Sequence, residues 1–417
     1  MCSTEKQING CFSAADILLP EGGYLQRWAV IACDQFTSQP EYWERVKALT
    51  KKVPSTYHLI LPEFELDKNP EPEIQRIQET MRDYLQQRVF LEYRDCFIYT
   101  ERTLRNGSVR SGLIGKIDLE QYDYRPSAVT PVRATEKTVP ERIPPRMAIR
   151  RGAPLELPHL ILFCDDERSM LIEPLREKKE RFPKLYDFEL MLGGGNVAGW
   201  LITGEEKRKI DQALLEYDRH EQEKHPGQNL LFAVGDGNHS LATAKACYEE
   251  LKQQNPNADF SEHPSRYALC ELNNIHDPCQ VFEPIHRVVK QCDAEKLILD
   301  LKESFPAGNG TAVSWVSGGR KGVLYLPDDG RLPLSVLQEF LDSWLNSNHG
   351  IIDYIHGEEA LKSLDHDRMT VGFRLPPIAK ESLFPCILMG GVLPRKTFSM
   401  GEAEEKRYYL EARRILP

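Results

Sequence analysis

The sequence lacks the features that mark membrane, secreted and nucleic-acid-binding proteins. No apolar run approaches the roughly 20 residues that a membrane-spanning helix needs, and residues 1–10 contain no apolar core of signal-peptide length. Basic residues form no dense run, and 53 Lys and Arg face 63 Asp and Glu, which gives a net charge of -10. Nucleic-acid backbones bind basic surfaces. We therefore expect no nucleic-acid partner, no membrane partner and a cytoplasmic location.

Clustered cysteines are also missing. The ten Cys residues are scattered along the chain, and no Cys-x-x-Cys pair or Cys-His cluster occurs. This pattern predicts neither a structural zinc site nor a disulfide framework, and it is typical of a protein in a reducing compartment.

The sequence does contain enough apolar residues for a large core. It has 417 residues, 41% of them hydrophobic and 28% charged, which is ample for more than one domain. Predicted strands and helices alternate through the second half, so we expect an α/β or α+β fold with a mixed sheet and flanking helices. We divide the chain into an N-terminal α/β region at 1–125, a core at 126–292, and a C-terminal α/β region at 293–417 that packs on the core.

Three segments carry further structural predictions. Residues 94–102 and 109–119 flank Asn106-Gly107, the strongest short signal for a β-hairpin. Residues 126–158 are rich in Pro and Arg without a sustained period, so they predict an irregular segment. Its arginines either form a solvated excursion or bring guanidinium groups to a phosphate or carboxylate, and both interpretations stay open. A helix is predicted after Tyr354-Ile-His-Gly357.

The clearest functional pattern lies between residues 230 and 245. It starts with the apolar run Leu230–Val234, which is typical of a strand buried on both faces. Two glycines within Gly235–Asn238 permit a sharp turn, and apolar residues then recur at helical spacing from Leu241 to Leu251. The sequence therefore predicts a strand, a tight turn and the amino end of a helix.

A turn of this kind suits an anionic ligand. The first backbone N–H groups of a helix have no partner within the helix, and the helix dipole adds positive charge there. Asp236, His239 and Ser240 lie in the same turn, so the segment predicts the floor of an active site. The alternative needs no ligand: Asn238 or Ser240 caps the helix, and His239 is only a polar residue of its first turn.

A second pair of polar residues lies within a predicted strand at 280–289. His286 and Arg287 are bounded by apolar residues and, as neighbours in a strand, point to opposite faces. A histidine in such a position is more often a hydrogen-bonded core residue than a catalyst.

Five short motifs occur in one order along the chain. They are Gly115-Lys-Ile-Asp-Leu119, Thr135-Glu136-Lys-Thr138, Gly235-Asp-Gly-Asn-His239, Glu283-Pro-Ile-His-Arg287 and Leu393-Pro-Arg-Lys-Thr-Phe398. In this order and rough spacing they resemble the bacterial and archaeal family called domain of unknown function 1015 (DUF1015), and the resemblance covers nearly the whole chain. The turn of that family in turn resembles the phosphate-binding turn of the ParB, sulfiredoxin and free-serine-kinase superfamily. The resemblance implies a ParB/serine-kinase-like core with large N- and C-terminal additions, and phosphate chemistry on a small molecule.

The sequence departs from the family pattern at two places. Thr135 stands where the family has His, and Asn238-His239-Ser240 stands where it has His-His-Arg. The missing Arg removes the best phosphate clamp of the turn, and Lys245 or Arg287 are the candidate replacements. Asn238 occupies the place of the sulfiredoxin cysteine, so we set that activity aside.

The leading hypothesis is a cytosolic phosphotransferase, or another phosphate-ester enzyme, that binds a phosphorylated small molecule at this turn. ATP or ADP would be the co-substrate and serine or phosphoserine the partner. Phosphoryl transfer needs neutralised charge, positioned donors and a base for an alcohol nucleophile. The predicted catalytic residues are Glu136 or His239 as base, His286 as the alternative base, and Asp236 as the ligand of Mg²⁺. The predicted ligand-binding residues are Gly235, Gly237, Asn238, Ser240, Lys245, Arg287, Lys396 and Thr397.

Two other classes of function stay open. A catalytically inactive sensor of metabolites or nucleotides would keep the pocket, and the departures in the turn are what such decay would leave. A DNA-associated regulator, by analogy with ParB, is disfavoured by the net charge of -10 and by the lack of a helix-turn-helix signal. The pattern gives no prediction of the oligomeric state.

Overall fold

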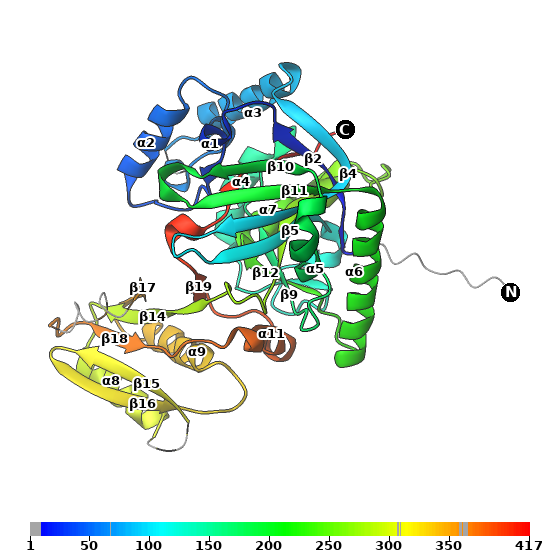
Figure 1. The fold of residues 1–417 in the computed structure, drawn as a ribbon. Coiled ribbons are helices and arrows are strands. Elements are labelled where there is room, and N and C mark those ends of the chain that lie inside the picture. The colour runs from blue at the N-terminus through cyan, green and yellow to red at the C-terminus, as the bar shows by residue number, and fades with distance from the viewer. Residues whose placement is uncertain (1–9, 67, 307, 309, 358–360, 362–365) are drawn as a thin grey trace. The chain divides into compact units, whose positions relative to one another are not determined.

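Mixed sheets with flanking helices organise the chain (Figure 1). The computed structural model describes residues 10–417 except 67, 307, 309, 358–360 and 362–365. Contacts divide the chain into two compact units, residues 1–280 with 402–417 and residues 281–401. This division differs from the three regions expected from the sequence, because the last residues of the chain return to the first unit. The α/β fold class is confirmed. The helix predicted after Gly357 falls outside the described residues.

A large mixed sheet forms the centre of the first unit. Its strands follow one another in space as β10 (Lys184–Glu189), β11 (Asn196–Ile202), β4 (Phe90–Thr103), β5 (Val109–Asp118), β13 (Tyr267–Asn274), β9 (Ile161–Cys164), β12 (Phe232–Asp236), β7 (Val132–Ala134) and β6 (Tyr122–Asp123). Two further strands extend it, β1 (Phe12–Ser13) beside β5 and β2 (Ala15–Pro20) beside β4. β9 runs parallel to β13 and antiparallel to β12. The hairpin predicted around Asn106-Gly107 is confirmed as β4 and β5.

Both faces of this sheet are buried. Along β4, Cys96 and Ile98 belong to one apolar cluster, whereas Phe97 and Tyr99 belong to another. This alternation is the period of two that a strand imposes on its side chains. The helices of the unit are α1 (Leu25–Trp28), α2 (Pro40–Thr50), α3 (Glu71–Gln86), α4 (Ile143–Arg150), α5 (Glu173–Lys178), α6 (Gly204–Lys224) and α7 (Asn238–Gln254).

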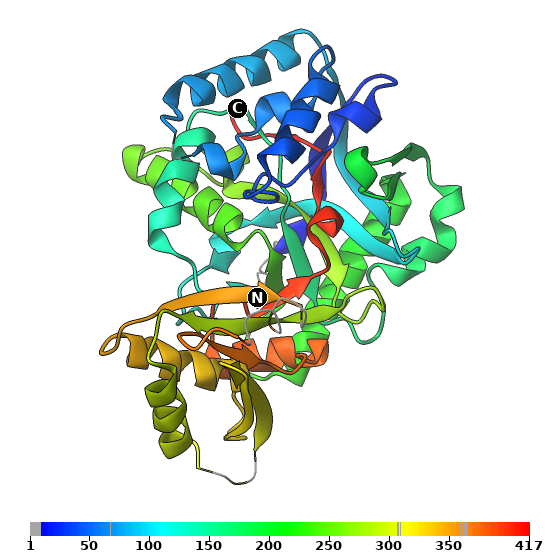
Figure 2. The ribbon, with the colours of Figure 1, turned by 90° about the vertical axis from the view of Figure 1, so that its left-hand side faces the viewer.

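Two short ribbons fasten the last residues of the chain to the first unit. β20 (Tyr408–Tyr409) pairs with β3 (Val30–Ile31), and β21 (Arg413–Arg414) pairs with β8 (Leu155–Glu156). In Figure 2 the red end of the chain accordingly runs beside blue segments from its beginning. Residues from the two ends of the sequence therefore meet in one unit.

The prediction of an irregular segment at 126–158 is wrong. The segment contains β7, α4 and β8, and α4 packs against α7. Its arginines have partners within the same unit: Arg142 and Arg146 pair with Glu63, Arg150 with Glu156, Arg151 with Glu250, and Arg133 donates to the carbonyls of Thr130 and Asn229. The arginines of α4 and its flanks thus join this helix to neighbouring segments of the first unit through ion pairs.

The second unit has its own sheet and core. Its strands are ordered as β16 (Arg320–Leu326), β15 (Thr311–Ser317), β18 (Val371–Arg374), β14 (Phe282–Lys290) and β17 (Ile351–His356), and β19 (Phe398–Met400) pairs with the start of β14. Its helices are α8 (Ala294–Ser304), α9 (Pro333–Leu345) and α11 (Leu383–Gly390). Leu297 of α8 and Leu341 of α9 pack with Phe373 of the sheet in one apolar cluster.

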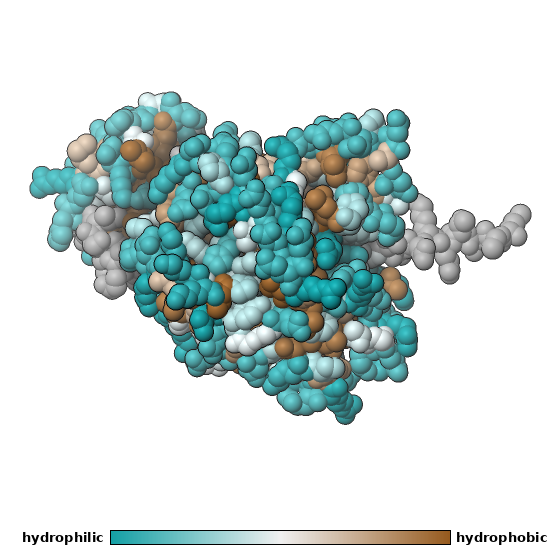
Figure 3. Space-filling view, turned by 90° about the horizontal axis from the view of Figure 1, so that it is seen from above, coloured by the Kyte–Doolittle hydropathy of each residue, from teal (hydrophilic) through white to brown (hydrophobic). Residues whose placement is uncertain are grey.

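The surface agrees with the composition. The face shown in Figure 3 is mainly hydrophilic, with apolar residues gathered in small patches. None of the helices that the structure describes combines the length and apolar character that a membrane-spanning helix needs.

Candidate functional site

The predicted strand, turn and helix are present at the carboxyl end of β12. The strand ends at Asp236, Gly237 has φ 86°, and α7 begins at Asn238. A side chain at Gly235 would place its Cβ 2.5 Å from the Phe163 ring, and Gly237 lies in the left-handed region that favours glycine. Both glycines are therefore required by the turn itself.

Side chains of the turn hold a neighbouring loop and leave the amino end of α7 uncapped. Gly237, which has no side chain, occupies the N-cap position. The Asn238 amide oxygen accepts from Thr135 N–H at 3.2 Å, and its amide nitrogen donates to Thr135 Oγ1 at 3.2 Å. Thr135 Oγ1 in turn donates to the carbonyl of Val234 at 2.6 Å. Asn238 thus joins β7 to β12, and capping by its side chain does not occur.

The loop 135–139 crosses the first turn of α7. Besides the Thr135 contacts, Val139 N–H donates to His239 Nε2 at 3.3 Å. An Nε2 that accepts a hydrogen bond leaves the proton of a neutral imidazole on Nδ1. Glu136 lies between these two anchored residues and is half-buried. The structure therefore brings Glu136, Asn238 and His239 together.

A lysine from the end of the chain supplies positive charge to the turn. The pairing of β20 with β3 continues into a bond from Ala32 N–H to the Arg407 carbonyl, which sets Lys406 opposite the residues that follow β3. Lys406 Nζ lies 3.5 Å from Asp236 Oδ2, and Asp236 Oδ1 accepts from Gly237 N–H at 3.0 Å. A cation and the amino end of a helix therefore meet at Asp236.

A chain of hydrogen bonds fixes a buried histidine beside the turn. His159 Nε2 lies 3.4 Å from Ser240 Oγ, and His159 Nδ1 lies 2.8 Å from the Tyr409 hydroxyl. Tyr409 donates to Cys33 Sγ at 3.1 Å. Burial, with a further contribution from Asp34, raises the pKa of the Cys33 thiol to about 12. Cys33 is therefore a neutral thiol rather than a nucleophile.

Asp34 completes this wall of the site as an ionised carboxylate. Burial by itself would raise its pKa, but His159, a hydrogen bond from Gln35 at 3.0 Å and Lys406 outweigh that effect, so the pKa is lowered. Opposite charge and donated hydrogen bonds both favour the charged form of a carboxyl group. The arrangement can bind an anion at the helix end and accept a proton at a carboxylate.

The site residues predicted from the sequence do not include Asp34, His159, Lys406 or Tyr409. In the sequence, Asp34 follows an apolar run that ends at Cys33, a pattern that fits either a pocket rim or a loop. No local pattern marks the other three. Lys406 and Tyr409 reach the turn only through antiparallel pairing with β3, far away in sequence.

Lys245, predicted to bind phosphate, faces away from the turn. Its ammonium group donates to the Leu119 carbonyl at 2.9 Å and pairs with Glu249 at 2.8 Å. It lies two turns along α7, about 10 Å from Asn238 at a rise of about 1.5 Å per residue. The structure does not bring Lys245 together with the other predicted residues.

The remaining predicted residues belong to the second unit. Arg287 is fully buried, and its guanidinium donates to Gln338 Oε1 and to the carbonyls of Ile285, Arg395 and Lys396. His286 Nδ1 accepts from Leu375 N–H at 3.2 Å. Thr397 is buried and donates to the Pro394 carbonyl, whereas the Lys396 side chain is exposed. These bonds hold the second unit together, and a role in catalysis or ligand binding stays a prediction.

Asp236 is placed to hold a metal ion only after a rearrangement. Its two carboxylate oxygens contact Gly237 N–H and Lys406. A Mg²⁺ ion would take the place of the Lys406 ammonium group, because both are cations that seek the same oxygen. The predicted metal role of Asp236 stays a prediction.

Solved structures with a distant likeness to this chain come from several proteins. C-terminally truncated SbnI from Staphylococcus aureus has 10% sequence identity and a TM-score of 0.37, covering 69% of this chain and 83% of that chain. A conserved hypothetical protein from Pyrococcus furiosus has 11% identity and a TM-score of 0.36, covering 71% and 93%. A free serine kinase variant in complex with AMP has 11% identity and a TM-score of 0.38, covering 71% and 90%.

Family membership rests on the sequence. A search among curated proteins finds no match. The model of the family described as protein of unknown function (DUF1015) matches residues 17–411, which include all five motifs. The match spans nearly the whole chain and confirms the resemblance seen in the motifs: the chain belongs to the DUF1015 family.

Proposed function

We propose that this protein is a phosphotransferase that binds a phosphorylated small molecule or nucleotide at the amino end of α7. One observation carries the proposal: Lys406 contacts Asp236 beside the uncapped amino end of α7, and the same lysine, with His159, helps to keep the Asp34 carboxylate ionised. Helix amides and a lysine stabilise the charge of a phosphate. A carboxylate near that phosphate can accept the proton of an alcohol nucleophile.

In the proposed reaction an alcohol oxygen attacks the transferred phosphorus. The O–P bond to the acceptor forms as the O–P bond to the leaving phosphate breaks, and the alcohol proton passes to a carboxylate. Asp34 takes this proton, and Glu136 in the loop 135–139 is the second base available at the turn. The amides of Asn238, His239 and Ser240 receive the phosphate oxygens, with Lys406 as counter-charge. Serine is the proposed alcohol, and ATP or ADP the proposed phosphate donor.

In this scheme the carboxylate of Asp236 would hold Mg²⁺ once the Lys406 ammonium group has moved away from it. When bound there it would neutralise phosphate charge, which is its usual contribution to phosphoryl transfer. Lys406 contacts the same carboxylate at 3.5 Å, so a cation at this position agrees with the charge of the site.

The test is phosphoryl exchange followed by mass spectrometry. Purified protein with Mg²⁺ is incubated with serine plus ADP or ATP, and separately with phosphoserine plus AMP or ADP. We expect exchange that disappears in Asp236→Ala, which loses the proposed Mg²⁺ ligand, and in His239→Ala, which loses the hydrogen bond that anchors the loop carrying Glu136, while both variants keep the circular dichroism spectrum of the wild type. Exchange retained in both variants would place the reaction elsewhere.

The same experiment separates an enzyme from a sensor. The turn has Asn238 and Ser240 where the family pattern has His and Arg, and this departure favours a binding protein as the second candidate. A sensor would raise its melting temperature with nucleotide or phosphoserine and form no product. Absence of both product and thermal shift would contradict both candidates.

A further inference from the structure

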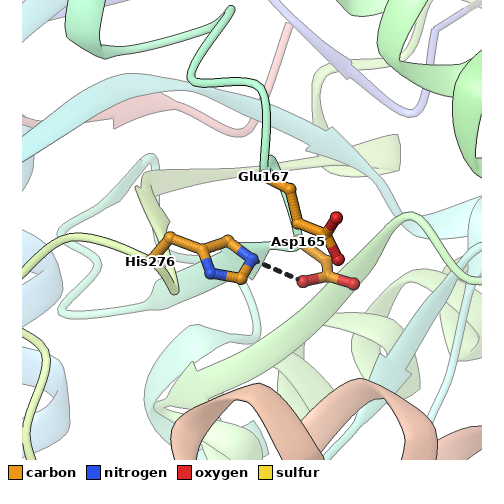
Figure 4. A group of neighbouring side chains, drawn as sticks. All are labelled: Asp165, Glu167 and His276. Carbon is orange, nitrogen blue, oxygen red and sulfur yellow. Dashed lines mark hydrogen bonds and ion pairs between the residues drawn. The ribbon is translucent and has the colours of Figure 1, made fainter.

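A second polar cluster lies at the opposite end of β9 from His159. Asp165 and Glu167 follow β9, and His276 follows β13. Because β9 and β13 are parallel and Cys164 pairs with Asn274, the residues after both strands meet at the same sheet edge. Figure 4 shows the three side chains converging, with His276 Nε2 2.8 Å from Asp165 Oδ1. One ligand atom from each of the three lies within 4.8 Å of the others.

One face of α6 covers this cluster. Tyr217, Glu221 and Lys224 recur at spacings of four and three, which places them on one side of the helix. The Tyr217 hydroxyl accepts from Asp165 N–H at 3.0 Å, and Lys224 Nζ lies 2.8 Å from both Asp165 Oδ2 and Glu167 Oε1. Glu221 stands between these two residues on the same side of the helix, and its carboxylate is close enough to Lys224, Asp165 and Glu167 for their charges to act on it, although it is not one of the three groups within 4.8 Å of one another.

Glu221 is the unusual member of the group. Its side chain is 3% exposed, and among the described residues neither carboxylate oxygen has a hydrogen-bond partner. The charged groups that act on it are Lys224, Asp165, Glu167 and Asp166. A buried carboxylate without partners is costly, and a cation between Glu221 and its neighbours would relieve that cost.

We propose that Asp165, Glu167, Glu221 and His276 form a site for a divalent transition-metal ion, with Zn²⁺ as the preferred occupant. Carboxylate oxygens with one imidazole nitrogen are ligands that Zn²⁺ accepts, whereas Mg²⁺ prefers oxygen alone. Zinc bonds of about 2.1 Å in a tetrahedron bring ligand atoms to about 3.4 Å from one another. The separations among Asp165, Glu167 and His276, which reach at most 4.8 Å, therefore need a contraction of up to about 1.4 Å, which the half-exposed Glu167 side chain can provide.

Lys224 holds the cation position when no metal is bound. Its ammonium group bridges Asp165 and Glu167, and its side chain is 26% exposed. A metal ion would displace it toward solvent, so the lysine and the metal compete for the same oxygens. Removal of the lysine should therefore raise the metal affinity, an effect that a purely structural ion pair would not produce. The proposal is independent of the phosphotransferase function, because the two sites lie at opposite ends of β9.

The experiment measures metal binding to the full-length protein freed of metal by a chelator. Isothermal titration with Zn²⁺ is expected to give one site, with Mn²⁺ weaker and Mg²⁺ weakest. His276→Gln and Glu221→Gln are expected to lower Zn²⁺ affinity at least about tenfold, and Lys224→Gln to raise it. Glu216→Gln and Glu223→Gln, which change exposed side chains of the same helix outside the cluster, serve as matched controls.

Two further measurements keep the proposal testable if a variant with a buried substitution does not fold. Glu167→Gln changes a side chain that is 56% exposed, so it can weaken the metal without disturbing the core. Co²⁺ in place of Zn²⁺ is expected to give visible absorption bands that the His276→Gln variant loses. Binding with no one-site stoichiometry, or Zn²⁺ affinity unchanged in His276→Gln, Glu221→Gln and Glu167→Gln, would overturn the proposal.

Discussion

The two ends of strand β9 carry polar clusters with different charge balance. At the amino end, Asp236 contacts Lys406 and lies at the positive end of α7, and Lys406 also stabilises the charge of Asp34. At the carboxyl end, Asp165, Glu167 and Glu221 face Lys224, and the Glu221 oxygens have no hydrogen-bond partner among the described residues. Four buried apolar residues, Ile161–Cys164, separate them. The proposed anion site and the proposed cation site therefore lie at opposite ends of one strand.

The largest effect on activity is expected when the Asp34 carboxylate at the amino end is neutralised. In Asp34→Asn we expect phosphoryl transfer to fall about 10²- to 10⁴-fold, the usual contribution of a proton-accepting side chain. The rate constant kcat from the mass-spectrometric exchange assay measures it. Glu41→Gln, an exposed carboxylate of α2, is the control. A kcat within twofold of wild type would remove Asp34 from the chemistry.

Removal of the cation at the same end tests the anion site directly. Lys406→Met is expected to weaken nucleotide or phosphoserine binding about 10- to 100-fold, because a hydrogen bond to a charged group contributes about 1.5–3 kcal/mol. Titration calorimetry gives the dissociation constant. If Lys406→Met binds as tightly as wild type, the amino end of α7 is not assisted by this lysine.

At the carboxyl end, the pH dependence of stability should report the Glu221 carboxylate, which has no hydrogen-bond partner among the described residues. Burial raises the pKa of Glu221 to about 7, and Asp165, Glu167 and Asp166 add to this although Lys224 opposes it. Between its ordinary pKa and about 7 the unfolded chain is ionised while the folded protein keeps its proton, so stability falls as pH rises through this window. The loss is about 1.4 kcal/mol per pH unit and stops above pH about 7.

Glu221→Gln cannot ionise and should lack this pH dependence. The measurement is urea unfolding of both proteins with a chelator present, at several pH values from 5 to 8. The wild type should lose about 3 kcal/mol relative to the variant across that range. Parallel curves for the two proteins would mean that Glu221 titrates normally.

The smallest effect is expected at Lys245, which belongs to neither end. Lys245→Met breaks the bond to the Leu119 carbonyl and the pair with Glu249, so we expect a stability loss of about 1 kcal/mol or less and unchanged ligand binding. Thermal melts and the same titrations measure both. Ligand affinity lowered tenfold would support the sequence-based prediction that Lys245 holds phosphate.

The sequence predicted local structure well and long-range assembly poorly. The turn at Gly235–Ser240 was readable because a buried strand, two glycines and a helical period follow one another within a few residues. Lys406 and His159 were not readable, since strand pairing brings them to the turn from distant segments. The segment 126–158 was misjudged because α4 and two short strands have too few residues to display a period.

The return of residues 402–417 to the first unit has a consequence for biosynthesis. Lys406 and Tyr409 leave the ribosome only after the whole second unit has been translated. Domains generally fold as they are synthesised, from the amino end onward, but here the first unit must wait for its last two ribbons. A nascent chain therefore holds an incomplete site throughout translation of residues 281–401, and a chain that stops early would lack the lysine and tyrosine of the site altogether.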